Sequence, residues 1–184
     1  MEIAAAQREV RRVYLGGAVG TIVSAVVWLV SAALGTWVSH KSAIIALILG
    51  GTFIFPVTML MLTVMGRAAS LPRGNPMGQL ATQVAFTIPL AYPVIGAAVL
   101  YNPNWFYPAF MVVVGAHYLP FVFLYGMPIY AALAGILVAG GWFVGTRRPH
   151  EFTIGGWITA LVLIVFAAMA AFVSRRDRAD GVSS

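Results

Sequence analysis

His117 is the only histidine, acid or base inside one of the long apolar stretches of this sequence. It lies in VVVGAHYLPFVFLYGMP, residues 112–128, and all the remaining residues of this segment are apolar, aromatic, glycine or proline. An imidazole can hydrogen-bond at both ring nitrogens, bind a metal or transfer a proton. Haem or zinc needs two or three converging ligands, and the other histidines, His40 and His150, fall in predicted loops. The sequence therefore predicts no metal site and no cofactor.

The acidic residues and cysteines narrow the chemistry further. All five carboxylates lie in terminal or loop segments, and there is no cysteine: Glu2, Glu9, Glu151, Asp177 and Asp180. Carriers coupled to protons or sodium usually place a carboxylate at mid-membrane, and acid–base catalysis commonly needs a pair of such groups. The sequence also lacks a nucleophile-elbow serine and a phosphate-binding glycine loop. These features predict a protein that is not an enzyme.

Polar side chains that could act with His117 are expected on the preceding apolar segment. Its residues Gln79, Thr82, Gln83 and Thr87 are spaced by three and four, which places them on one face of a helix. The turn NPN at 102–104 makes this segment and the next antiparallel neighbours, so His117 should lie within a helical turn of Thr87 and Tyr92. The predicted ligand-binding residues are His117, Gln83, Thr87, Tyr92 and Tyr118.

Two main interpretations of His117 stay open on the sequence, beside a contact with the lipid interface or with another subunit. In the structural one, the imidazole donates to a single backbone group on a neighbouring helix, which contributes about 0.6 to 2 kcal/mol to the bundle. In the functional one, it binds a ligand or handles a proton in a small polar pocket. Pro56, Pro89, Pro93 and Pro120 favour such a pocket, because each proline leaves a helix carbonyl without its usual donor.

The elements that position these residues are membrane-spanning helices. The chain has 184 residues, of which 61% are hydrophobic and only 9% charged, too few charges to cover a water-soluble domain. Apolar runs of about 20 residues recur, and that length crosses a hydrocarbon core about 30 Å thick. The fold class is therefore all-α, a polytopic bundle of six transmembrane helices, predicted near residues 14–38, 42–65, 79–101, 105–125, 127–145 and 152–173.

The basic residues predict the orientation. With both termini in the cytoplasm, eight of the eleven basic residues lie on the cytoplasmic side, as the positive-inside rule requires. Residues 1–13 are then an amphipathic cytoplasmic segment, residues 14–173 the six-span domain and residues 174–184 a polar cytoplasmic tail. The bias toward arginine, alanine, valine and glycine is typical of GC-rich bacterial genomes. We therefore expect a multi-pass protein of the bacterial cytoplasmic (inner) membrane.

Two segments carry a resemblance to a known family. QREVRRVYLGGAVGTIVSAVVWL and GAHYLPFVFLYGMP resemble a family of short bacterial multi-span integral membrane proteins classed as a domain of unknown function. The resemblance extends over most of the chain. It implies a fold class and no chemistry, so no functional residue is transferred from it.

Two functions are consistent with these features. The first is binding or passage of a small neutral or weakly polar molecule through an intramembrane pocket near His117. The alternative is a non-catalytic structural or accessory membrane subunit that packs through glycine-rich faces, such as Gly16 to Gly20 and Gly141 to Gly145. The expected partners are membrane lipids with either a small-molecule ligand, a second copy of the chain or a partner membrane subunit, and no nucleic acid.

Overall fold

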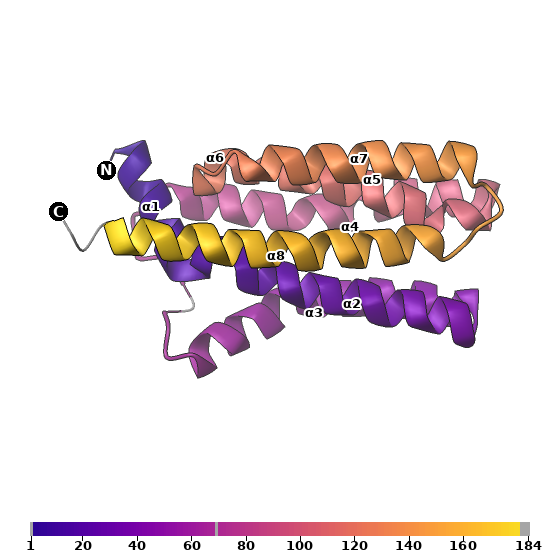
Figure 1. The fold of residues 1–184 in the computed structure, drawn as a ribbon, viewed down its shortest axis with the longest axis horizontal. Coiled ribbons are helices and arrows are strands. Elements are labelled where there is room, and N and C mark those ends of the chain that lie inside the picture. The colour runs from indigo at the N-terminus through magenta and orange to yellow at the C-terminus, as the bar shows by residue number, and fades with distance from the viewer. Residues whose placement is uncertain (1, 69, 181–184) are drawn as a thin grey trace.

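The computed structural model describes residues 2–68 and 70–180, and within these residues it contains helices and no strands (Figure 1). Eight α-helices and two short 3-10 helices follow one another along this part of the chain. In order, they are α1 (Ile3–Tyr14), η1 (Leu15–Gly17), α2 (Ala18–Trp37), α3 (His40–Val64), α4 (Met77–Tyr101), η2 (Pro103–Trp105), α5 (Phe106–Tyr118), α6 (Phe121–Tyr125), α7 (Ile129–Arg147) and α8 (Ile154–Asp180).

Six helical segments of the described residues are long and apolar enough to cross a membrane. They are centred on α2, α3, α4, the pair α5 and α6, α7, and α8, in the order that the sequence predicts. The predicted fold class, an all-α bundle with six membrane-spanning helices, is confirmed. The protein is therefore a multi-pass membrane protein.

The first helix is separated from the first span by a left-handed bend. Leu15, Gly16 and Gly17 have φ angles of 55°, 62° and 81°, a region that glycine enters at little cost. The bend lets α1 pack one face against the bundle, with Ala6, Val10 and Val13 buried. In addition, side chains of α1 donate to the last carbonyls of α6: Gln7 to Phe123 and Arg11 to Tyr125.

The fourth and fifth spans are joined by a true turn. Gly126 adopts φ 61°, which ends α6, and Pro128 directly precedes α7. A further interruption at Leu119 and Pro120 divides the fourth span into α5 and α6, because proline cannot donate the helical hydrogen bond. At the other end of the chain, α8 continues to Asp180, beyond the predicted end of the sixth span at residue 173. Residues 181–184 of the predicted tail lie outside the described residues.

The spans are buried to different extents. Helices α2, α5, α7 and α8 form the centre of the bundle, where α2 packs on α8 and α5 packs on α7. Helix α3 lies against α2, and α4 lies against α5. Only 11% of the most apolar stretch is buried in each of α3 and α4, against 39% or more in the other four spans. Both helices therefore present most of their surface outward.

Candidate functional site

His117 and Thr87 meet between α5 and α4. The imidazole Nδ1 lies 2.8 Å from the Thr87 hydroxyl oxygen, and the His117 side chain is half-buried. The antiparallel turn at residues 102–104 therefore brings these two residues into contact, within the one helical turn of depth that the sequence predicts. The pair lies one turn before the break at Leu119 and Pro120, near the end of α5.

The direction of the hydrogen bonds follows from the single proton of the threonine hydroxyl. Thr87 Oγ1 lies 2.7 Å from the Val84 carbonyl oxygen and donates its proton there. It can then only accept from His117, so Nδ1 carries a hydrogen. A neutral imidazole with hydrogen on Nδ1 has a lone pair on Nε2. The Val84 carbonyl also accepts from the imidazole, and this bond comes from the same Nδ1 hydrogen. The lone pair on Nε2 is therefore left as an open acceptor.

Two aromatic rings pack close to the imidazole. The His117 ring centroid lies 5.1 Å from that of Phe121 and 5.6 Å from that of Tyr118. Tyr118 is buried and contacts Tyr130, whose hydroxyl donates to the Gly16 carbonyl oxygen at 2.7 Å. This packing fixes the orientation of the ring and connects the site to the bend between α1 and α2.

The other predicted ligand-binding residues are spread along α4. Gln83 is exposed, and no contact joins it to His117 in the described residues. Tyr92 is half-buried and packs on Phe110 of α5, with ring centroids 6.0 Å apart. The structure therefore brings together His117, Thr87 and Tyr118, and places Tyr92 farther along the contact between α4 and α5.

An apolar groove begins at Tyr92. Its volume is about 300 Å³, and it lies between α3, α4 and α5. Its lining is almost wholly aliphatic and aromatic: Ile44, Ile48, Tyr92, Ile95, Gly96, Val99, Leu100, Phe106 and Phe110. Since His117 is not among these residues, the predicted pocket around the imidazole is not this groove. The groove offers room for a hydrocarbon group.

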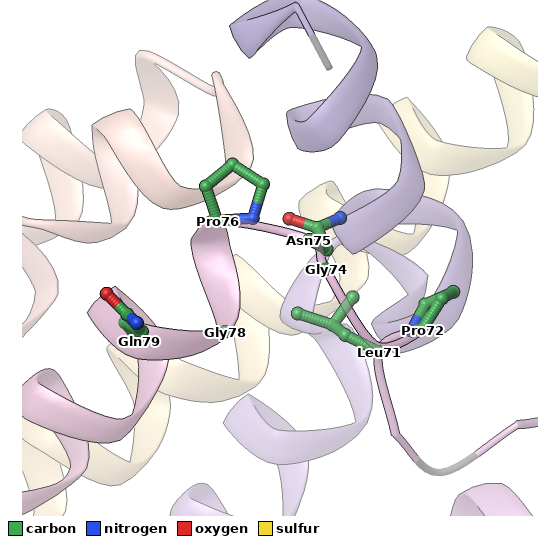
Figure 2. A pocket seen from close by; sticks show the side chains of 7 residues that line it. All are labelled: Leu71, Pro72, Gly74, Asn75, Pro76, Gly78 and Gln79. Atoms are coloured by element: carbon green, nitrogen blue, oxygen red, sulfur yellow. The ribbon is translucent and has the colours of Figure 1, made fainter.

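A second cavity of about 430 Å³ lies at the loop between α3 and α4, where Figure 2 shows its lining side chains. Asn75 organises this loop, because its side chain donates to Glu9 at 2.8 Å and accepts from the Met77 amide at 2.9 Å. Asn75 is not among the residues that the sequence predicts to be functional. An asparagine two residues before the first residue of a helix is the signal that could have found it.

The glycine-rich faces are used inside the chain. A Cβ on Gly141 would lie 2.7 Å from the Pro108 carbonyl oxygen, and one on Gly16 would lie 2.2 Å from the Ser174 hydroxyl. These glycines therefore allow close contacts of α7 with α5 and of η1 with α8. These two glycine contacts are therefore made within one copy of the chain.

Metal ligands do not gather in the described part of the chain. No group of three histidine, aspartate or glutamate side chains in it could hold a metal ion. The polar features that remain are the His117–Thr87 pair, the open Nε2 and the groove at Tyr92.

Replacing Thr87 with valine removes the hydroxyl and keeps the shape of the side chain. We expect the free energy of unfolding to fall by about 0.6 to 1.7 kcal/mol, the range measured for hydrogen bonds between helices in membranes. Unfolding in dodecyl sulfate, followed by tryptophan fluorescence, would measure this. The matched control is Thr146→Val, whose hydroxyl bonds only within its own helix. Equal losses in both variants would contradict a bond between α4 and α5.

Comparison with known proteins identifies the family of this chain and nothing further. No curated protein and no solved structure matches the chain. The model of a family of unknown function, DUF7010, matches residues 3–173. This range includes five spans, the sixth except for its last residue, and also His117, Thr87 and Tyr92. The chain therefore belongs to the DUF7010 family of unknown function, as its resemblance to a domain-of-unknown-function family predicts.

Proposed function

We propose that this protein binds a small neutral or weakly polar molecule within the bacterial inner membrane. The observation that carries this proposal is the open acceptor on His117. An alcohol or amide that enters from the lipid could donate to Nε2, because the bond from Nδ1 to Thr87 fixes the tautomer and the ring position. Hydrocarbon cannot provide such a donor. The preferred ligand therefore carries an O–H or N–H group.

The apolar part of the ligand would follow the contact between α4 and α5 toward the groove. His117 and Phe110 lie two turns apart on one face of α5, which separates them by roughly 10 Å along the helix. Phe110 lines the groove, and so does Tyr92 from α4. Ligand-binding roles are thus proposed for His117, Thr87, Tyr92 and Tyr118, whereas Gln83 faces outward.

The orientation proposed for the protein has both termini in the cytoplasm. Helix α1, the loop between α3 and α4, and the end of α8 lie at one end of the bundle (Figure 1). Eight of the eleven basic residues belong to these segments: Arg8, Arg11, Arg12, Arg67, Arg73, Arg175, Arg176 and Arg178. The positive-inside rule places that end in the cytoplasm.

A binding role is proposed rather than catalysis. The site supplies one imidazole and one hydroxyl, and both are already joined to each other and to Val84. A nucleophile needs a second group that acts as its base or orients it. Binding needs only the fixed acceptor and apolar room.

Photolabelling tests the proposed function. The probe is an aliphatic alcohol that carries a diazirine on its chain, added to the purified full-length protein in lipid nanodiscs. We expect labelling of α4 or α5 that falls at least tenfold in His117→Ala and in Gly96→Leu. Gly96 lines the groove, and a Cβ added there meets no atom within 4 Å, so a leucine side chain is expected to extend from an unobstructed Cβ and occupy the groove.

Gly135→Leu is the matched control, because Gly135 also has open space around it but lies on α7, away from the groove. It should label like the unmodified protein. Competition by octanol but not by octane would support recognition of the hydroxyl. Unchanged labelling in His117→Ala would overturn the proposal.

A further inference from the structure

The outward face of α4 carries a continuous row of exposed side chains. Seven residues alternate in spacing by four and three along the helix, which is the spacing of a coiled-coil contact. All seven are exposed: Gln79, Gln83, Phe86, Leu90, Pro93, Ala97 and Leu100. The exposed fractions of Phe86, Leu90 and Leu100 are 60%, 75% and 90%. We call this row the α4 seam.

The opposite face of α4 already has its partner. Met77, Val84 and Ile95 are buried there, and α4 lies against α5. The two end residues of the seam, Gln79 and Leu100, also line the loop cavity and the apolar groove. Between them, the α4 seam points away from the bundle, toward lipid or another protein.

The Gln83 side chain makes contact between the α4 seam and lipid hydrocarbon unfavourable. Helix α4 has 25 residues, and Gln83 lies six residues from its middle, about 9 Å along the axis. The hydrocarbon core extends about 15 Å on either side of its centre. No hydrogen bond of the Gln83 side chain is present among the described residues. An amide that is exposed to hydrocarbon without a partner costs several kcal/mol.

We propose that the α4 seam is the contact between two copies of this chain. Two copies in one membrane have the same orientation, so a two-fold axis along the membrane normal brings each seam against itself. Gln83 then faces Gln83 of the other copy. A primary amide has both donors and an acceptor, so two such groups satisfy each other. The alternating spacing suits the crossing angle of about 20° that is common between membrane helices.

Cysteine cross-linking tests the location of the contact, and the natural chain has no cysteine that would interfere. Leu90→Cys places a thiol in the α4 seam. Leu161→Cys is the matched control, because Leu161 is 63% exposed on α8 but lies outside the seam. On oxidation in membranes at low protein density, we expect at least tenfold more disulfide dimer from Leu90→Cys. Equal yields, or cross-links only to other membrane proteins, would overturn the proposal.

Gln83→Ala tests the role of the amide in the full-length protein. We expect the dimer dissociation constant to rise about tenfold, since polar contacts between membrane helices contribute on the order of one tenfold step. Energy transfer between labelled copies, measured as the protein is diluted into lipid vesicles, reports this constant. Thr82→Ala is the control, because the Thr82 hydroxyl already donates to Gly78 of its own helix at 3.0 Å. A protein that is monomeric at every dilution, or a loss that is equal in both variants, would overturn the proposal.

Discussion

Replacing Gly17 with alanine should reduce the free energy of unfolding by about 2 to 5 kcal/mol. Gly17 has φ 81°, where an L side chain costs on the order of 1 to 2 kcal/mol. An added Cβ would also lie 2.1 Å from the Tyr130 hydroxyl oxygen. Tyr130 is fully buried, so its displacement should lower the free energy of unfolding by about a further 1 to 3 kcal/mol.

The displaced hydroxyl would also leave the Gly16 carbonyl, to which it donates at 2.7 Å. Unfolding in dodecyl sulfate, followed by tryptophan fluorescence, measures the total. Gly66→Ala separates the two causes, because Gly66 has φ 69° but no atom within 4 Å of an added Cβ. Gly66→Ala should lose only the backbone contribution. Equal losses at both positions would show that Tyr130 does not resist a side chain at Gly17.

Replacing Tyr107 with alanine should reduce the free energy of unfolding by about 3 to 5 kcal/mol, the usual cost of removing a large buried ring. Tyr107 is fully buried, and its ring packs tilted against Trp28 with centroids 5.9 Å apart. A Cβ on Gly156 would lie 2.8 Å from this ring, so glycine at that position is what admits it. The loss of the ring leaves a cavity where α2, α5 and α8 meet.

The hydroxyl of Tyr107 gives a sharper comparison. Ser31 donates to the Ala43 carbonyl at 2.9 Å, so the Tyr107 hydroxyl must donate to Ser31 at 2.7 Å. Tyr107→Phe therefore leaves the serine bonded to Ala43 and should cost about 0.5 to 1.5 kcal/mol. Ser31→Ala leaves a buried tyrosine hydroxyl without an acceptor and should cost about 1 to 3 kcal/mol. The opposite order would contradict this direction of donation.

The six spans could be predicted because their signal is local. A run of about 20 apolar residues needs no knowledge of its neighbours, and lipid forces it to be helical. The turn at Gly126 to Pro128 carries no charged residue that would mark it as a loop. The structure makes it a left-handed helix end at Gly126, followed by Pro128. Both are features that glycine and proline favour locally.

The depth of the site could also be predicted, but not its surroundings. A short turn between antiparallel helices predicts that His117 lies within a helical turn of Thr87, and their hydrogen bond agrees with this depth. The same reasoning placed Gln83 at the site, and in the structure its exposed side chain makes no hydrogen bond with His117. Residues four apart on a helix differ by about 40° in direction. Whether both side chains reach a neighbouring helix depends on the angle at which that helix crosses α4.

By itself, the sequence determined the class of protein, the number of spans and the approximate depth of His117 relative to Thr87, because apolar length and chain connectivity are sufficient for these. Only the tertiary structure decided which faces meet. The glycines of α7 contact α5 inside the chain, and the α4 seam points outward. Moving apolar surface from lipid into a contact between helices gains little free energy, because lipid is itself apolar. The choice of neighbours therefore depends on close packing and on paired polar groups, which exist only once the helices are placed in space.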